Sequence, residues 1–415
     1  MLWSCSVLSC GSFYSVRRYF LSTEKKAETK IRLLVSAVEP SADLHLAHLI
    51  EELRGSRPDI ECRGFGGERM REAGCVTDAD PTAFSSVGFG FFLNIGRYFS
   101  LLKRFDRLLR ELEPAAVLLV DAPAFNFLLA RLARWRGVPV VYYICPQIWA
   151  WAPWRRRKVL RYTDLLIPII PFEEELYSND RVPVHYVGHP LADELSALDD
   201  NLGEELRNSL GISADEKLIG VFPGSRRQEV EGLSSSFFNL LARMELDPDR
   251  HRIAVSALRD DFVDVIVSAA SSHGLKTEII QGDCRPLMSA CDLALVASGT
   301  ASLELAWFEK PMLVFYKVSR LGYWLFKGFF SVTPWFTLPN ILGCAANAGE
   351  ATVFEKLLRS DNELEPIAPL ARELLDDEEK RAEVVGRLRK LKEACLVPGA
   401  NAKAATVLND FLSSI

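Results

Sequence analysis

The chain has 415 residues and a net charge of −6; 49% of its residues are apolar and 25% are charged. This composition excludes a disordered chain, and the length exceeds one ordinary hydrophobic core, so we expect two globular domains. The nine cysteines are scattered and form no CxxC pair. Their distribution argues against a disulfide framework or a structural zinc site and favours a reducing compartment.

The first 30 residues differ from the rest of the chain. They hold several serines, Arg17 and Arg18, and no acid before Glu24. This composition is typical of an organelle transit peptide, whereas a secretory signal would need a continuous apolar region. We therefore expect residues 1–30 to be the transit peptide of a mitochondrial matrix protein that can associate with the inner membrane, with a chloroplast protein as the alternative. Their removal leaves a body of net charge −9, which argues against general nucleic-acid binding.

Strand-like apolar runs alternate with amphipathic helical stretches along the whole body. In the first half the runs cover 31–37, 115–122, 138–145, 164–170 and 184–188. After an acidic stretch at 195–217 they resume at 217–224, 251–258, 276–282, 292–299 and 311–316. This rhythm predicts two α/β domains with parallel, doubly wound sheets, which is the plan of a GT-B glycosyltransferase. We place the domains at 31–205 and 206–390, followed by a C-terminal helix at 391–415.

Polar residues follow two strand-like runs of the first half. Glu39, Ser41 and Asp43 come after the first run, where Ser41 or Asp43 could instead cap the next helix. Asp121 ends the strongly apolar run "VLLVDAPAFN", and Pro123 prevents the strand from continuing. A partly desolvated carboxylate at the carboxyl end of a parallel strand suits a general base, although a turn aspartate is the alternative.

Two loops of the second half could bind a diphosphate. The turn Gly224-Ser225 offers backbone N–H groups at a helix start, and Arg226 can donate two parallel hydrogen bonds to a phosphate. The loop Ser298-Gly299-Thr300 also precedes a helix, in which Glu304 could accept hydrogen bonds from a ribose. Either loop alone is weak evidence, but together they indicate a nucleotide diphosphate site.

Metal binding is not expected. Asp78 and Asp80 form a DxD triplet that follows no evident strand, so we expect a solvated loop there. The histidines show no spacing that includes a third ligand. No GxxxxGK[ST] sequence is present, which excludes a P-loop.

Two segments, 84–99 and 321–339, are rich in large apolar side chains but are interrupted by glycines, Lys327 and Pro334. They could be core or a lipid-facing surface. The stretch "WAWAPWRRRKVLR" at 149–161 joins aromatic residues to five cations. It could be a solvated helix face or could meet anionic headgroups at a membrane surface.

Nine motifs in order resemble the lipid-A-disaccharide synthase family over nearly the whole chain after residue 30: "SAVEPSAD", "GFGGERM", "VDAPAFN", "CPQIWAWAPWRRRKV", "DLLIPIIPFE", "VGHPLAD", "PGSRRQEV", "ASGTASLE" and "LPNIL". The resemblance implies a GT-B enzyme that works without metal or cofactor at a membrane surface. It would join UDP-2,3-diacylglucosamine to 2,3-diacylglucosamine 1-phosphate through a β-1,6 linkage and release UDP. Together with the N-terminal composition it indicates an organellar form, as in plant mitochondria, and a homodimer is a further expectation.

The resemblance also assigns roles to single residues. Asp121 would deprotonate the acceptor 6-hydroxyl. The donor would be bound by Gly224, Ser225, Arg226, Ser298, Gly299, Thr300, Glu304 and Asn340. The acceptor side would include Glu39, Ser41 and Asp43, and acyl chains would contact Phe89, Phe91, Phe92 and the 324–335 region.

The chain departs from the family pattern in several places. Val38 and Ala42 replace the glycines of the usual "SAGEPSGD", and Arg359 stands where the family tends to carry glutamine. A nucleotide- or lipid-binding protein without activity is therefore an alternative, and a related UDP-sugar transferase or epimerase with a soluble substrate is another.

Overall fold

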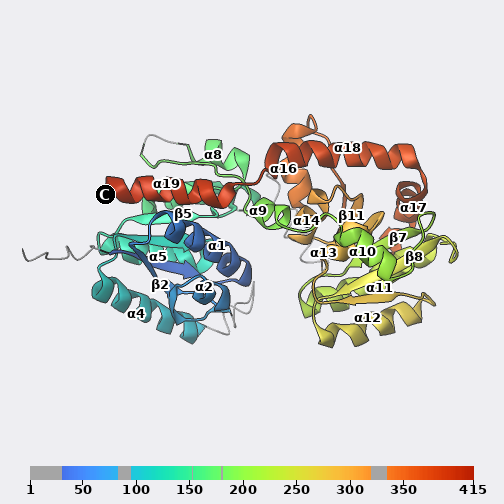
Figure 1. Cartoon of the computed structure of the whole chain (residues 1–415), viewed down its shortest axis with the longest axis horizontal. Coiled ribbons are helices and arrows are strands. Elements are labelled where there is room, and N and C mark those ends of the chain that lie inside the picture. Colours follow the sequence, from blue (N-terminus) through green and yellow to red (C-terminus); the bar gives the residue numbers. More distant parts are fainter. Residues whose placement is uncertain (1–29, 83–94, 152, 179–180, 319–333) are drawn as a thin grey trace, which may run out of the picture.

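The computed structural model describes residues 30–82, 95–151, 153–178, 181–318 and 334–415. These residues form two α/β units side by side, each built on a parallel six-stranded sheet (Figure 1). The predicted pair of doubly wound domains is confirmed.

The first sheet has the strand order β3-β2-β1-β4-β5-β6. Successive residues of β1 enter different buried clusters, Leu33 and Val35 one and Leu34 the other. Both faces of this sheet are covered, which explains why its central strands are apolar without alternation. The strands are β1 (Ile31–Ala37), β2 (Ile60–Phe65), β3 (Val76–Ala79), β4 (Ala116–Val120), β5 (Val140–Tyr143) and β6 (Leu165–Ile167).

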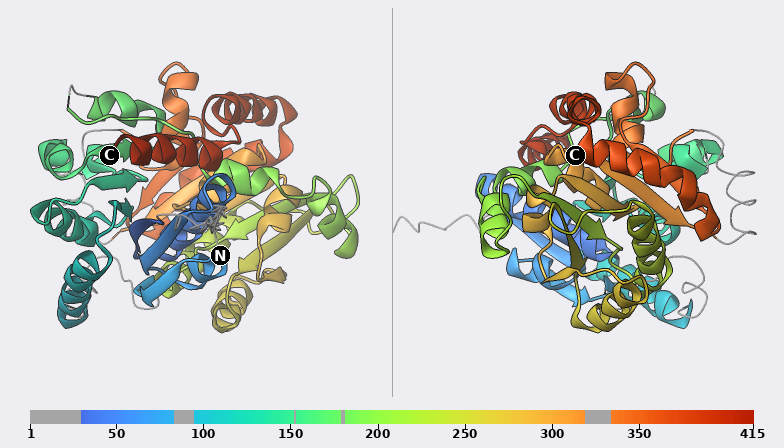
Figure 2. Two further views of the ribbon diagram at one scale, coloured as in Figure 1. Left: turned by 60° about the vertical axis from the view of Figure 1, so that its left-hand side comes forward. Right: turned by 90° about the vertical axis from the view of Figure 1, so that its right-hand side faces the viewer.

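Helices α4, α5 and α7 form one layer, with α4 next to α5 and α5 next to α7 (Figure 2, left view). Helix α1 lies on the other side of the sheet, between α2 and the C-terminal helix α19. The helices of this unit are α1 (Pro40–Ser56), α2 (Glu68–Glu72), α4 (Ile95–Leu112), α5 (Pro123–Trp135), α6 (Ile148–Trp151), η2 (Pro153–Arg155), α7 (Arg156–Tyr162), α8 (Pro171–Tyr177) and α9 (Leu191–Ser196).

The second sheet has the order β12-β11-β10-β7-β8-β9. Its strands are β7 (Lys217–Phe222), β8 (His251–Ala257), β9 (Glu278–Gln281), β10 (Leu293–Ala297), β11 (Met312–Lys317) and β12 (Phe354–Leu358). Its helices are α10 (Leu202–Ser209), α11 (Arg227–Arg243), α12 (Asp260–Ser272), α13 (Arg285–Ala290), α14 (Ala301–Trp307), α16 (Leu338–Ala346), η3 (Asp361–Ile367), α17 (Ala368–Asp376) and α18 (Glu378–Cys395). The last helix, α19 (Ala400–Ser414), packs on the first unit. Among the described helices, none combines the length and the apolar character needed to cross a bilayer.

Two local predictions are wrong. The run 184–188 is no strand, since only Val184 bridges to Leu166 at the open edge beyond β6. Asp78 does not lie in a solvated loop but on β3, where its carboxylate accepts two hydrogen bonds of 2.8 Å from Arg63. That pairing neutralises the carboxylate within the sheet and leaves the DxD triplet a structural role.

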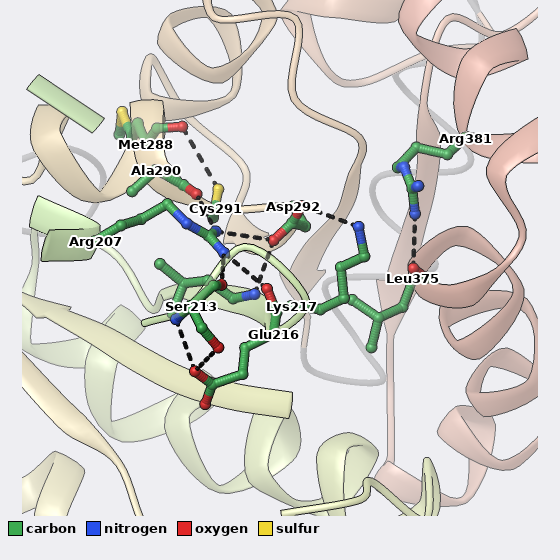
Figure 3. Close-up of polar contacts among 11 residues, drawn as sticks. Arg207, Ser213, Glu216, Lys217, Met288, Ala290, Cys291, Asp292, Leu375 and Arg381 are labelled. Carbon is green, nitrogen blue, oxygen red and sulfur yellow. Dashed lines mark hydrogen bonds and ion pairs between the residues drawn. The ribbon is translucent and has the colours of Figure 1, made fainter. Parts of the chain in front are cut away.

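Helix α10 is hydrogen-bonded to the amino ends of β7 and β10 (Figure 3). These ends lie opposite the carboxyl edge of the sheet, from which the 223–226 turn and the 298–300 loop emerge. The Arg207 guanidinium donates to the carboxylate of Asp292 at 3.1 Å and to the carbonyl oxygen of Glu216 at 2.7 Å. Gly203 lets α10 approach α13, because a Cβ there would lie 2.7 Å from the backbone of Ser289. These contacts assign α10 to the second sheet by packing.

The chain returns to the first unit through its last helix. Asp193, in α9, accepts hydrogen bonds from the backbone N–H groups of Gly399 and Asn401 and so holds the first turn of α19. Helix α19 then lies along α1 (Figure 1). One buried cluster runs through both units, from Leu33 on β1 through Leu191 on α9 to Leu303 on α14. The two units are therefore joined by a shared hydrophobic core.

Candidate functional site

Glu39 and Asp121 lie together at the point where the strand order of the first sheet reverses. Strands β1 and β4 are neighbours, and Ala37 pairs with Val120 at their carboxyl ends. Later strands are added outward from β1 on one side and from β4 on the other. The turns after these two strands therefore leave the same edge in opposite directions, which opens the place where α/β sheets bind ligands.

Asp121 has the environment of a general base. Burial raises the pKa of its carboxyl to about 6, the Glu39 carboxylate adds to this, and the Ala122 backbone N–H and His45 oppose it. The residue as a whole stays partly exposed. A carboxylate with a pKa near 6 is mostly ionised at pH 7 yet more basic than an ordinary aspartate. The prediction that Asp121 sits at the mouth of the sheet thus has a physical basis in the structure.

The other acceptor candidates lie in helix α1, which begins at Pro40 with Glu39 in the cap position. Neither Ser41 nor Asp43 is the N-cap, so that alternative is wrong. Ser41 is exposed beside Glu39. Asp43 is buried and accepts backbone hydrogen bonds from Gly67 at 2.6 Å and from Arg69 at 3.1 Å, which holds the start of α2. Its part in acceptor binding stays a prediction.

The second sheet repeats this arrangement with the two predicted donor loops. Strands β7 and β10 are neighbours at its reversal point, and Phe222 pairs with Val296. The turn at 223–226 and the loop at 298–300 therefore leave the sheet side by side. Ser225 and Arg226 are exposed, as are Gly299 and Thr300. Two loops that are far apart along the chain are therefore neighbours in the structure.

A carboxylate already binds the donors of the first loop. Oε2 of Glu229 accepts hydrogen bonds from the backbone N–H groups of Ser225 at 3.1 Å and Arg226 at 3.3 Å. Oε1 lies 3.0 Å from the Arg226 guanidinium. Gly224 has φ +122°, and a Cβ there would lie 2.6 Å from Glu229. The turn therefore binds an anionic group in the way expected for a phosphate, and a phosphate can use the same donors only if Glu229 turns away.

Titratable side chains of both units lie close together. Nδ1 of His45 lies 3.2 Å from Oε1 of Glu194, which belongs to α9. Burial raises the pKa of Glu304, the Glu194 carboxylate adds to this and Arg285 opposes it. Helices α9 and α14 are in contact. His45 and Glu194 of the first unit thus share one electrostatic environment with Arg285 and Glu304 of the second.

Asn340 lies away from any exposed surface. Its side-chain amide donates to the carbonyl oxygen of Val353 at 3.0 Å and to Glu355 at 2.8 Å, and its oxygen accepts from the Val353 N–H at 2.9 Å. It is fully buried. These bonds tie α16 to the start of β12, and a contact with the donor stays a prediction.

Other sequence predictions concern metals and acyl chains. Among the residues that the structure describes, no group of three potential metal ligands occurs. His189 is buried, its Nδ1 accepts the Leu191 N–H at 3.2 Å, and burial lowers its pKa to about 3, so it lies before α9 as a neutral ring. Phe89, Phe91, Phe92 and nearly all of 324–335 lie outside the described residues.

The departures from the family pattern do not obstruct the site. Val38 and Ala42 are buried in two hydrophobic clusters, so neither side chain projects from the surface at the strand edge. Neither has a positive φ that would require glycine. Arg359 follows β12 and donates a hydrogen bond of 2.7 Å to Glu363.

Sequence reasoning missed the residues that connect the parts of the site. Glu194 and Arg285 carry no local signal, because only the packing of α9, α13 and α14 brings them together. Asn126 and Tyr142, which bind the backbone of Asp121, were also missed. Asn126 could have been suspected, since an asparagine in the first turn of a helix often bonds to nearby backbone.

Comparison with known proteins agrees with this geometry. The sequence profile of the lipid-A-disaccharide synthetase family matches residues 33–408. A lipid-A-disaccharide synthase from Anaeromyxobacter sp. (strain K) is 35% identical over 376 residues, covering 90% of this chain and 96% of the relative. Lipid-A-disaccharide synthase 1 from Legionella pneumophila is 35% identical over 368 residues, covering 88% and 93%.

A solved structure supports the fold. The S. aureus MnaA–UDP co-structure superposes with a TM-score of 0.64 at 14% identity and covers 93% of this chain and 98% of its own. At this identity the likeness concerns the fold alone. The predicted GT-B fold is confirmed.

The electrostatics of Asp121 predict a pH dependence. The rate of a reaction that uses Asp121 as its base should rise with pH through about 6 and level off above it, because only the ionised carboxylate accepts a proton. Replacing Glu39 with Gln removes a charge that raises this pKa, so the rise should move to lower pH. The measurement is kcat/KM against pH for both proteins. Glu51→Gln, an exposed acid farther along α1, should leave the profile unchanged; an equal shift there would contradict the assignment.

Proposed function

Because the chain belongs to the lipid-A-disaccharide synthetase family, we propose that it is an inverting glycosyltransferase that joins UDP-2,3-diacylglucosamine to 2,3-diacylglucosamine 1-phosphate. The products would be the β-1,6-linked disaccharide 1-phosphate and UDP. The observation that supports the proposal is the position of Asp121 at the reversal point of one sheet and of the two predicted donor loops, side by side, at the reversal point of the other.

The reaction would proceed in one displacement. Asp121 takes the proton of the acceptor 6-hydroxyl while the hydroxyl oxygen forms a bond to C1 of the donor sugar. The bond from C1 to the diphosphate breaks, and its electron pair leaves with UDP. Holding both sugars in line between the two sheets supplies the proximity that the step needs.

The donor would be bound at the second sheet. The backbone N–H groups of Ser225 and Arg226, in the turn that Gly224 makes, and the Arg226 guanidinium would stabilise the charge that grows on the diphosphate. Ser298, Gly299 and Thr300 lie beside them, and Glu304 would accept hydrogen bonds from the ribose. Since Glu229 binds the same donors, its carboxylate would have to turn away as the diphosphate enters.

The acceptor would lie near Glu39 and Ser41, next to Asp121. Asp43 and Asn340 remain weaker candidates, because their polar atoms bind other parts of the chain.

A membrane-facing surface would be the layer of α4, α5 and α7. Four large apolar side chains are exposed on these helices and on the adjoining η2: Phe99, Leu128, Trp135 and Trp154. Exposed cations lie among them: Lys103, Arg131, Arg157, Lys158 and Arg161. Aromatic side chains mixed with cations favour the headgroup region of an anionic membrane.

Asp121→Asn tests the proposed reaction. Asparagine has nearly the same shape and tolerates the positive φ of this position, so the fold should persist. Transfer should fall by about 10²–10⁴-fold, whereas UDP affinity should stay within about twofold. The assay is mass detection of a tetraacyl disaccharide phosphate from the two acylated glucosamine substrates. UDP binding by the wild type without any transfer would favour a nucleotide-binding protein instead.

Vesicle sedimentation tests the membrane surface. The full chain should bind phosphatidylglycerol vesicles more tightly than phosphatidylcholine vesicles, and added salt should weaken the binding. Trp135→Ser with Trp154→Ser should reduce it several-fold. Val267→Ser, which changes an exposed apolar residue on α12 of the second unit, is the matched control. Equal binding by all variants would rule this surface out.

We propose mitochondrial targeting from the composition of residues 1–30. Fused to a fluorescent protein, these residues should direct it to mitochondria, and a diffuse or chloroplast signal would contradict the proposal. Self-association as a homodimer is proposed from the family resemblance alone, and sedimentation velocity of the purified chain tests it.

A further inference from the structure

The backbone at Asp121 has an unusual conformation. Asp121 has φ +48° and Ala122 has φ +43°, so two consecutive residues other than glycine are left-handed. Each costs about 1 kcal/mol or more relative to the ordinary conformation. Pro123 follows at the start of α5. This turn makes the chain leave β4 sharply, and the surrounding structure must hold it in place.

Asn126 holds the turn from α5. It is fully buried, and its side-chain N–H groups donate to the carbonyl oxygen of Val120 at 2.9 Å and to that of Asp121 at 2.8 Å. Its oxygen accepts a hydrogen bond of 3.0 Å from the hydroxyl of Ser36 on β1. The two carbonyl oxygens fix which way the amide points, because a flipped amide would aim its oxygen at them, and the Ser36 hydroxyl adds a donor to the amide oxygen.

Tyr142 holds the same turn from β5. Its buried hydroxyl donates to the carbonyl oxygen of Asp121 at 2.6 Å. That carbonyl therefore receives two hydrogen bonds, one from α5 and one from β5, which is the full capacity of its two lone pairs. The backbone of Asp121 is fixed by side chains from two elements, α5 and β5, and Ser36 of β1 bonds to one of these side chains.

We propose that Tyr142 and Asn126 are positioning residues for the reaction, which orient the Asp121 carboxylate by fixing its left-handed backbone. The inference rests on the proposed function. Both side chains are fully buried, so they act on the reaction through Asp121 and not by contact with substrate. Displacement of a reacting group by 1 Å can cost about 10²-fold in rate.

Tyr142→Phe tests this, with Tyr143→Phe as the matched control. Tyr143 is the next residue of β5 and equally buried, but its hydroxyl lies 3.4 Å from Asn401 of α19. We expect Tyr142→Phe to lower kcat about tenfold relative to the wild type and to leave KM within twofold. The melting temperatures of Tyr142→Phe and Tyr143→Phe should be equal. Tyr143→Phe should keep the wild-type kcat. Equal losses in the two variants, or a loss that appears only in KM, would overturn the proposal.

A double mutant separates positioning from a general structural role. If Tyr142 acts through Asp121, then Asp121→Asn with Tyr142→Phe should be no slower than Asp121→Asn alone. A further loss in the double mutant would overturn the proposal. If Tyr142→Phe does not fold, Asn126→Asp takes its place in the double mutant. This change replaces two donors by a carboxylate that faces two carbonyl oxygens. Asp121→Asn with Asn126→Asp should then be no slower than Asp121→Asn alone. Absence of transfer by the wild type would refute the proposed function itself, whereas an inactive Asp121→Asn beside a fully active Tyr142→Phe would refute only the positioning.

Discussion

The parallel direction of all strands is the constraint from which the rest of the structure follows. It sends every strand-to-helix turn of a sheet out of one edge, and it requires cover on both faces of each sheet. As a result, the central strands are apolar along their whole length and show no alternation of polar and apolar residues. The consequence for function is that each sheet has one place, at its order reversal, where neighbouring turns diverge and polar groups can meet a ligand. Asp121 and Arg226 occupy these two places.

Helix α9 connects the two places although it has only six residues. Its two successive carboxylates make different contacts. Asp193 binds the first turn of α19 and so holds the last helix on the first unit. Glu194 lies against His45 and interacts electrostatically with Arg285 of the second unit. Packing of Leu191 into the shared core fixes the helix between them. The arrangement of the two binding edges thus depends on a short segment that carries no catalytic motif.

Sequence could predict the apolar strands and the loops that follow them, because burial and turn chemistry leave local patterns. It missed β2, β3 and β12, which contain Arg63, Thr77 or Lys356 and lie outside the central pairs. It assigned Asn340 and Asp43 to ligand binding and could not show the internal hydrogen bonds that both side chains make, since a polar residue beside a motif looks the same in both roles. The contact of Glu229 with the phosphate loop, and of Tyr142 with Asp121, depends on three-dimensional approach and has no local pattern.

The negative net charge of the protein makes substrate binding depend on short-range contacts. The body beyond residue 30 carries −9, and both proposed substrates are anions, so long-range attraction does not favour their approach. Binding then depends on groups that act within a few ångströms: oriented N–H donors, Arg226, and apolar or cationic surface that meets the lipid. Glu229 binds the same donors as the proposed diphosphate. The turn therefore stays ordered through this internal anion, and a ligand with two or more charged oxygens has to compete with a single carboxylate, which a diphosphate can do.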